Sequence, residues 1–191
     1  MESRKRTNDG YHHGALREAL IERALDRLSA GVRVTELSVR SLATELGVSK
    51  GAPYRHFPSA EALIAAVAAR GFSELAEKLR EAGSTSLPAI GIAYVRFAAE
   101  NPELYRGMYH FPAEEIVAYP DLAAEADRAF SVLRQAVEES SDSPPGLAAT
   151  AAWAYVHGLA ELSINRLSTH LDVDDDETMR SLMSAFVLPR P

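Results

Sequence analysis

The sequence predicts an all-α protein of 191 residues with a small N-terminal domain and a larger C-terminal one. Apolar residues recur at helical spacing over most of the chain, and no stretch has the alternation typical of a strand. Pro, Ser, Asn and Asp stand where the helical stretches begin. A chain of this length can bury a core without disulfides, and it contains no cysteine. We therefore expect helices alone and no thiol chemistry.

Charge divides the chain into two parts. Residues 1–58 carry a net charge of +3 and residues 59–191 one of −10, which together give the −7 of the whole chain. A basic segment on an acidic body is typical of a DNA-binding domain joined to a domain with another role. We therefore expect a domain boundary at residue 58. Residues 1–10 are either a basic arm that contacts DNA or a solubilising terminus.

The first domain is expected to contain three helices. An apolar stripe over residues 16–30 predicts the first, and Gly31 ends it. Two shorter helices follow over residues 38–46 and 49–57, with Gly47 between them, where a turn requires positive φ. This order is that of a helix-turn-helix, in which the second helix enters the major groove of DNA. The alternative is an ordinary helical hairpin on the surface.

The second helix of this pair carries most of the candidate DNA contacts. Ser38 and Ser49 stand where N-cap hydroxyls accept from free backbone N–H groups. Pro53 is expected in the first turn, where its missing N–H costs little. The predicted DNA-binding residues are Ser38, Arg40, Ser49, Lys50, Gly51, Ala52, Tyr54, Arg55 and His56.

The motif in this region resembles that of the TetR family of bacterial transcription regulators. The matching runs are Val39-Arg40-Ser41-Leu42-Ala43, Gly47-Val48-Ser49-Lys50-Gly51 and Tyr54-Arg55-His56-Phe57. The resemblance implies a homodimer that binds double-stranded operator DNA, with Tyr54 and His56 on phosphates, and that an effector commonly releases. Ala60 departs from the family, which commonly has Lys there, so one phosphate contact is expected to be missing.

A second motif resembles the signature of one subgroup of this family. Trp153-Ala-Tyr-Val-His157-Gly158-Leu159 is similar to the Trp-His-Gly signature of that subgroup's C-terminal domain. The body is expected to contain helices at about residues 60–81, 87–100, 102–109, 122–140, 147–166 and 177–187.

Aromatic residues gather in the body. Nine of the fourteen lie between Tyr94 and Tyr155. They form either a pocket for a small, largely apolar effector or a well-filled core. The predicted ligand-binding residues are Tyr94, Phe97, Tyr105, Met108, Phe130, Trp153 and His157.

The helix over residues 147–166 is apolar on more than one face, so it is expected to be buried on several sides. One face is expected to pair with the last helix and with the same two helices of a second subunit. The alternative is burial within one chain. The predicted dimer residues are Val156, Leu159, Met179, Leu182, Met183 and Phe186.

Other functions are disfavoured by what the sequence lacks. It has no glycine-rich phosphate loop, Gly-x-Ser-x-Gly elbow or metal-binding histidine pair on a helix, so neither an enzyme, a cofactor nor a metal is expected. The acidic run over residues 172–177 lacks the spacing of a calcium loop and fits a helix N-terminus. A ligand-binding helical module without DNA binding remains the main alternative. A cytoplasmic protein without a membrane anchor is expected.

Overall fold

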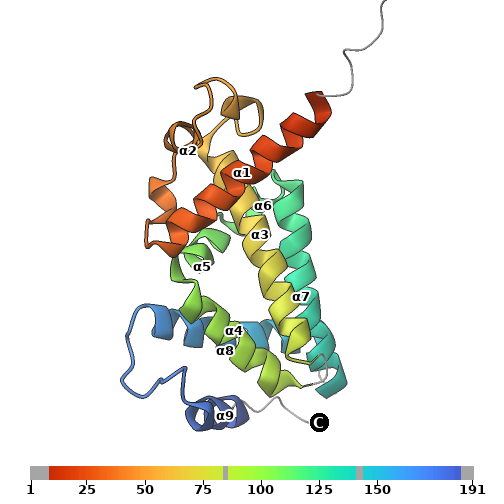
Figure 1. The fold of residues 1–191 in the computed structure, drawn as a ribbon. Coiled ribbons are helices and arrows are strands. Elements are labelled where there is room, and N and C mark those ends of the chain that lie inside the picture. Colours follow the sequence, from red (N-terminus) through yellow and green to blue (C-terminus); the bar gives the residue numbers. More distant parts are fainter. Residues whose placement is uncertain (1–8, 84–85, 141–143, 186–191) are drawn as a thin grey trace, which may run out of the picture.

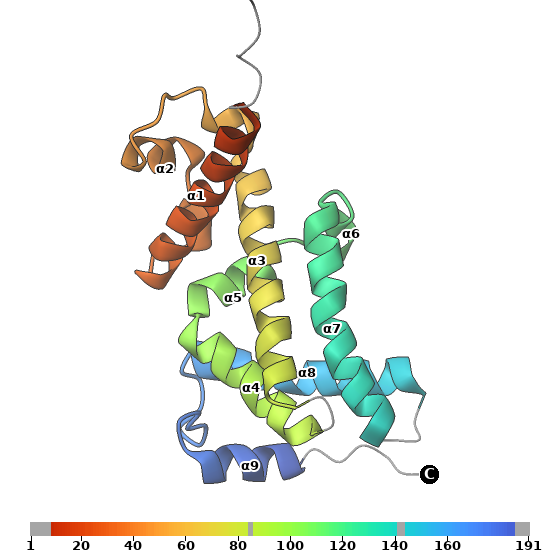
Figure 2. The ribbon, with the colours of Figure 1, turned by 45° about the vertical axis from the view of Figure 1, so that its right-hand side comes forward.

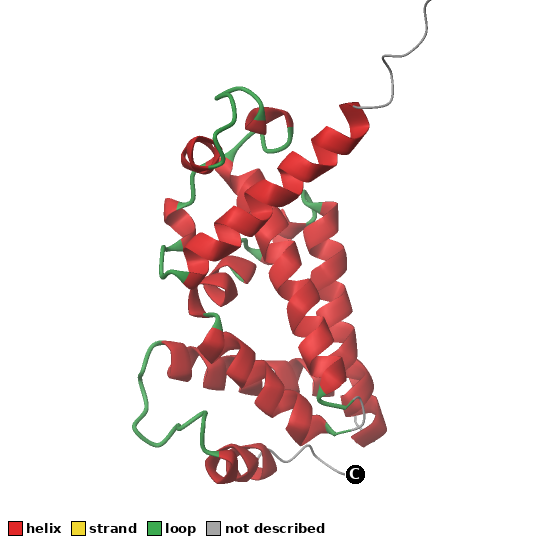
Figure 3. Ribbon diagram, in the orientation of Figure 1, coloured by secondary structure: helices red, strands yellow, loops and turns green. Residues whose placement is uncertain are grey.

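The structure is a computed structural model that describes residues 9–83, 86–140 and 144–185. Across these ranges it contains helices and no strand, which confirms the predicted fold class (Figure 3). No helix in the described part of the chain is both long enough and apolar enough to cross a membrane. The long helix α3 runs from the N-terminal end of the molecule into the body, with α7 beside it (Figures 1 and 2).

The head, as we call the N-terminal unit, comprises one long helix, three short elements and the start of a second long helix. They are α1 (Asp9–Ser29), the 3₁₀ turn η1 (Val34–Glu36), α2 (Val39–Glu45) and the 3₁₀ turn η2 (Pro53–Arg55), followed by the start of α3 (Ala60–Glu81). The Ser38 hydroxyl caps α2 by accepting from the N–H of Ser41, as predicted. Gly47 follows α2 with φ of 66°, which explains why glycine stands at the turn.

The prediction of an α-helix over residues 49–57 is wrong, because the structure has no continuous α-helix there. The segment is a series of tight turns that ends in η2, with Ala52 N–H donating to the Ser49 carbonyl and His56 N–H to the Pro53 carbonyl. Pro53 has no N–H to donate to Ser49, so an α-helical bond is lost at this point. Ser49 therefore accepts through its carbonyl, and no α-helix begins there. We call residues 49–57 the recognition segment.

Six further helices build the body around the lower part of α3. They are α4 (Leu87–Glu100), α5 (Pro102–Met108), α6 (Ala113–Ile116), α7 (Pro120–Ser140), α8 (Pro145–Ile164) and α9 (Asp176–Ala185). α8 packs on α4 and α7, and α9 packs on α4. These helices agree with the sequence expectations within a few residues at their ends, except that α6 was not expected.

Two other observations concern helix starts. α1 begins at Asp9, inside the predicted arm over residues 1–10, and residues 1–8 lie outside the described ranges. The acidic run acts as a helix start, as predicted, because the Asp175 carboxylate accepts from the N–H of Thr178 at 2.8 Å. The pKa of Asp175 lies below its usual value, first because of a hydrogen bond from the Thr178 side chain and next because of this backbone bond.

Candidate DNA-binding surface and ligand cavity

The recognition segment lies at the end of the molecule farthest from α8 and α9 (Figure 1). Pro53 and Phe57 anchor it, since both are buried and Phe57 is only 2% exposed. The guanidinium of Arg17, on α1, lies 5.7 Å from the centre of the Phe57 ring. The segment therefore has an apolar inner side that fixes it on α1 and α2.

All nine predicted DNA-binding residues reach the surface of the head. Seven are exposed, and Ala52 and His56 are half-buried; the exposed ones are Ser38, Arg40, Ser49, Lys50, Gly51, Tyr54 and Arg55. Tyr54 is 47% exposed, which is unusual for a large aromatic side chain that packs in a core. Within the described ranges Arg40, Lys50 and Arg55 form no ion pair, so their charges are available to phosphate or to base edges.

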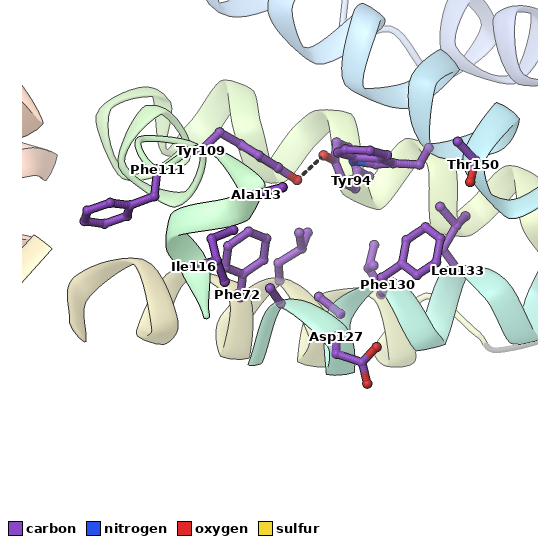
Figure 4. Close-up of a pocket in the computed structure, with 15 residues that line it drawn as sticks. Phe72, Tyr94, Tyr109, Phe111, Ala113, Ile116, Asp127, Phe130, Leu133 and Thr150 are labelled. Carbon is purple, nitrogen blue, oxygen red and sulfur yellow. Dashed lines mark hydrogen bonds between the residues drawn. The ribbon is translucent and has the colours of Figure 1, made fainter. Parts of the chain in front are cut away.

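A cavity of about 470 Å³ lies in the body between α3, α4, α7 and α8, and the segment that includes α6 closes one end (Figure 4). Its wall is mainly aromatic and aliphatic. The lining residues are Phe72, Leu75, Leu79, Tyr94, Tyr109, Phe111, Ala113, Ile116, Ala126, Asp127, Ala129, Phe130, Leu133, Thr150 and Trp153. The volume and the apolar wall are those of a small-molecule site.

Polar groups are concentrated on one wall, where three tyrosines meet His157. The Tyr94 hydroxyl lies 2.7 Å from that of Tyr109 and 3.0 Å from that of Tyr105. The Tyr105 hydroxyl lies 2.6 Å from Nδ1 of His157. Burial raises the pKa of all three tyrosines, so their hydroxyls stay protonated and act as neutral hydrogen-bonding groups.

Of the seven predicted ligand-binding residues, three line the cavity, two lie behind its wall and two lie elsewhere. Tyr94, Phe130 and Trp153 line the cavity. Tyr105 and His157 lie behind the wall and hold Tyr94 by hydrogen bonds.

Phe97 and Met108 lie away from the cavity wall. Phe97 faces a separate groove between α4 and α9, and Met108 is buried against Gly71 of α3. Among the lining residues that the sequence did not single out are Phe72, Leu75 and Leu79, which form the α3 wall. Their helical spacing was visible, but a buried stripe has the same pattern whether it fills a core or lines a cavity.

Protonation of His157 is expected to destabilise the protein in mild acid. Burial lowers its pKa below the usual 6.5, so the unfolded chain takes up this proton at a higher pH than the folded chain. The free energy of unfolding should therefore fall as the pH drops below about 6.5. His157→Gln should flatten the decline of the melting temperature between about pH 7 and 5. His170→Gln, at an exposed histidine, is the control. If the melting temperature of His157→Gln declines with falling pH as steeply as that of His170→Gln, groups other than His157 cause the decline.

The predicted dimer residues lie mostly within the core of the single chain. Four are 9% exposed or less: Val156, Leu159, Met179 and Met183. Leu182 is half-buried, and its carbonyl accepts from the Tyr155 hydroxyl at 2.7 Å. Phe186 lies outside the described residues. For the four buried residues the structure agrees with burial within one chain, because α8 is enclosed by α4 and α7 and α9 packs on α4.

The solvent-exposed face of α8, which we call its outward face, does not include these buried residues. Its exposed residues recur every three or four positions along the helix: Leu147, Ala151, Ala154, Gly158 and Leu162. Leu147 is 70% exposed and Leu162 38%. A Cβ atom on Gly158 would meet nothing within 4 Å, so no described helix of the same chain approaches it closely.

Two family models match the chain. That of bacterial regulatory proteins of the tetR family matches residues 34–67, and that of tetracyclin repressor-like C-terminal domains matches residues 87–186. A comparison with curated protein sequences gives no match.

Solved structures share the fold over nearly the whole chain. A protein of unknown function from Rhodococcus sp. RHA1 is 30% identical, with a TM-score of 0.75 over 93% of this chain and 96% of its own. A regulatory protein of the tetR family from Rhodococcus RHA1 is 17% identical, with a TM-score of 0.62 over 88% and 94%. The TetR-like transcriptional regulator LfrR from Mycobacterium smegmatis, solved with proflavine, is 23% identical, with a TM-score of 0.57 over 91% and 97%. The chain therefore belongs to the tetR family of bacterial regulatory proteins, and it is a DNA-binding transcription regulator rather than an enzyme.

Proposed function

We propose that this regulator is a dimeric repressor that a small, largely apolar ligand releases from operator DNA. The observation that carries the proposal is an apolar cavity of about 470 Å³ in a body that α3 joins directly to the exposed recognition segment. A ligand that prefers a conformation with displaced heads would lower the affinity for DNA by linkage.

Operator binding is assigned to the outer side of the head. Lys50, Tyr54 and Arg55 are exposed on the recognition segment, and Arg40 is exposed on α2. Tyr54 and His56 are proposed to hold phosphates, which fixes the register of the head on the duplex. Arg55 or Lys50 would then read a guanine edge in the major groove.

The ligand is expected to be neutral and mainly apolar. The hydroxyls of Tyr94 and Tyr109 already bond to one another, and the Thr150 hydroxyl donates to the Gly146 carbonyl at 2.8 Å. Among the described residues that line the cavity, Asp127 alone is charged, and its carboxylate points away from the cavity (Figure 4). The M. smegmatis relative was solved with proflavine, which supports a planar aromatic ligand as one class to test.

Dimerisation is proposed to use the outward face of α8, in place of the buried residues first expected. The small residues Ala151, Ala154 and Gly158 would let a second copy of the helix approach closely, with Leu147 and Leu162 at the two ends. Two-fold operators are read by paired heads about 34 Å apart, so a dimer contact far from the heads suits this role.

Two finer assignments complete the proposal. The run Trp153-Ala-Tyr-Val-His157-Gly158 supports membership of the subgroup with the Trp-His-Gly signature. A regulator that binds chromosomal DNA acts in the cytoplasm, where we place the protein.

Transcription in vitro from the promoter upstream of the protein's own gene tests repression directly. The protein should retard this fragment in a gel-shift assay and lower its transcript level, and Lys50→Ala should do both more weakly. Retardation accompanied by a raised transcript level would show activation and overturn the assignment as a repressor. If the fragment is not retarded, this promoter does not contain the operator. The operator is then selected from a library of random DNA duplexes.

A further inference from the structure

Four side chains form a continuous row of hydrogen bonds that begins at the cavity, and we call it the hydroxyl relay. Its members, in order, are Tyr109 at the C-cap of α5, Tyr94 on α4, Tyr105 on α5 and His157 on α8. The first contact, of 2.7 Å between the Tyr109 and Tyr94 hydroxyls, lies at the cavity (Figure 4). The next two, of 3.0 and 2.6 Å, lead through Tyr105 to Nδ1 of His157. The relay therefore has three contacts and three hydroxyl protons.

His157 sets the direction of the relay. Burial lowers the pKa of its imidazole, so at neutral pH the ring is uncharged and only one of its nitrogens carries a proton. The contact of 2.6 Å between the Tyr105 hydroxyl and Nδ1 is shorter than usual for an N–H donor and lies in the range of hydroxyl donors. Tyr105 therefore donates to Nδ1, and the ring proton lies on Nε2. The carboxylate of Glu161, one turn further along α8, acts on the same imidazole and favours a proton there.

The other two protons then have only one arrangement that satisfies every contact. Each tyrosine hydroxyl can donate once. Since the proton of Tyr105 is used on His157, the Tyr94 hydroxyl must donate to Tyr105, and the Tyr109 hydroxyl must donate to Tyr94. Any other order leaves two lone pairs facing one another across a contact of 3.0 Å or less. Tyr109 thus gives its proton away from the cavity and offers a ligand only its oxygen lone pairs.

The remaining polar hydrogens on the wall are also used. Among the described side chains that line the cavity, Trp153 and Thr150 are the other two with a polar hydrogen. The indole N–H of Trp153 bonds to the hydroxyls of Tyr94 and Tyr109. The Thr150 hydroxyl donates to the Gly146 carbonyl at 2.8 Å. These side chains can therefore accept a hydrogen bond from a ligand, but none has a proton left to donate.

We propose that the cavity selects apolar aromatic ligands that carry a hydroxyl donor, and discriminates against ligands of the same shape whose polar group can only accept. The inference rests on the proposed function and specifies the class of ligand at the same site. A phenol can donate to the Tyr109 oxygen while its rings contact the aromatic wall. A ketone in the same place meets only lone pairs, and a buried acceptor without a partner is costly.

Two probes of similar shape test this selection: 2-naphthol, which can donate, and 2-acetylnaphthalene, whose ketone only accepts. Isothermal titration calorimetry at neutral pH measures the affinity of each for the wild-type protein without DNA. We expect 2-naphthol to bind more tightly by roughly 5- to 150-fold, the range for a buried acceptor left without a partner.

Two substitutions that release a proton to the ligand should remove the preference. In His157→Leu the relay has no acceptor at its end, so its direction can reverse and Tyr109 can donate to the ketone. In Tyr94→Phe the Tyr109 hydroxyl loses its acceptor and can turn to the ligand. In both variants the ketone should bind more tightly, to within about twofold of 2-naphthol. Because His157 lies behind the wall, a role in packing alone would not change which probe is preferred.

Tyr119→Phe is the matched control. Its hydroxyl lies outside the relay, and its ring packs on Phe111 with a centroid separation of 4.9 Å, so this variant should keep the preference for 2-naphthol. Thermal melting first shows which variants are folded. Equal binding of the two probes to the wild type would overturn the inference and leave the ligand-binding role of the cavity standing. A preference that persists in both Tyr94→Phe and His157→Leu would also overturn it. If neither probe binds, the inference and a cavity for small aromatic ligands fail together.

Discussion

Replacing Ala151 and Ala154 by Glu should convert the protein to a monomer and weaken operator binding by about 100-fold or more. Both residues are exposed on the outward face of α8, so the carboxylates are hydrated in a monomer and cost little. In the proposed dimer they would be buried without partners, at a cost of several kcal/mol. Sedimentation velocity at micromolar concentration and anisotropy with labelled operator measure the two effects.

A glutamate on another exposed helix face controls for charge itself. Ala124, on α7, is exposed, and Ala124→Glu should remain a dimer with nearly unchanged operator affinity. Both proteins should melt at temperatures close to that of the wild type. A double Glu variant of α8 that still sediments as a dimer would place the interface elsewhere on the body.

Arg55→Ala should reduce discrimination at one operator position by about 1–3 kcal/mol, or roughly 5- to 150-fold. Arg55 is exposed on the recognition segment and forms no ion pair in the described part of the chain, so it can reach a guanine edge. Affinities for single-base variants of the operator give the discrimination directly.

Tyr54→Phe is the matched comparison for Arg55→Ala. It removes only a hydroxyl from a side chain that is 47% exposed, and it should weaken binding to operator and scrambled DNA alike. If Tyr54→Phe leaves both affinities unchanged, the proposal that the Tyr54 hydroxyl contacts a phosphate is wrong. A uniform loss in Arg55→Ala would assign Arg55 to a phosphate instead of a base.

The helices of the body could be predicted because their signals are local. α3 and α4 have the predicted bounds, and each begins after a serine whose hydroxyl accepts from a backbone N–H of the first turn. The recognition segment departs from prediction because the effect of Pro53 depends on where the helix starts. Pro53 was expected in the first turn of an α-helix. Instead, the Ser49 carbonyl accepts from the N–H of Ala52, and the segment forms 3₁₀ turns.

The cavity and the dimer surface could be predicted only in part, because each depends on contacts between distant helices. α8 is apolar around most of its circumference, and the sequence does not say which face meets α4 and α7. Gly158, for example, lies on the exposed face of α8. Likewise, an aromatic cluster has the same composition in a filled core and around a cavity. The wall that α3 contributes could not be predicted, because α3 is distant in sequence from the aromatic cluster.

Control of DNA binding by the cavity is tested most directly by one pair of titrations with the same ligand. A ligand from a thermal-shift screen of neutral aromatic compounds is titrated with the protein while the fluorescence of Trp153, the only tryptophan, reports binding at the cavity. The same ligand is then added to the complex with labelled operator, and anisotropy reports release of DNA. We predict that both signals change over the same ligand concentrations and that operator affinity falls by about 5- to 150-fold. A ligand that saturates the Trp153 signal and leaves operator affinity unchanged would contradict the proposed control of DNA binding by this cavity.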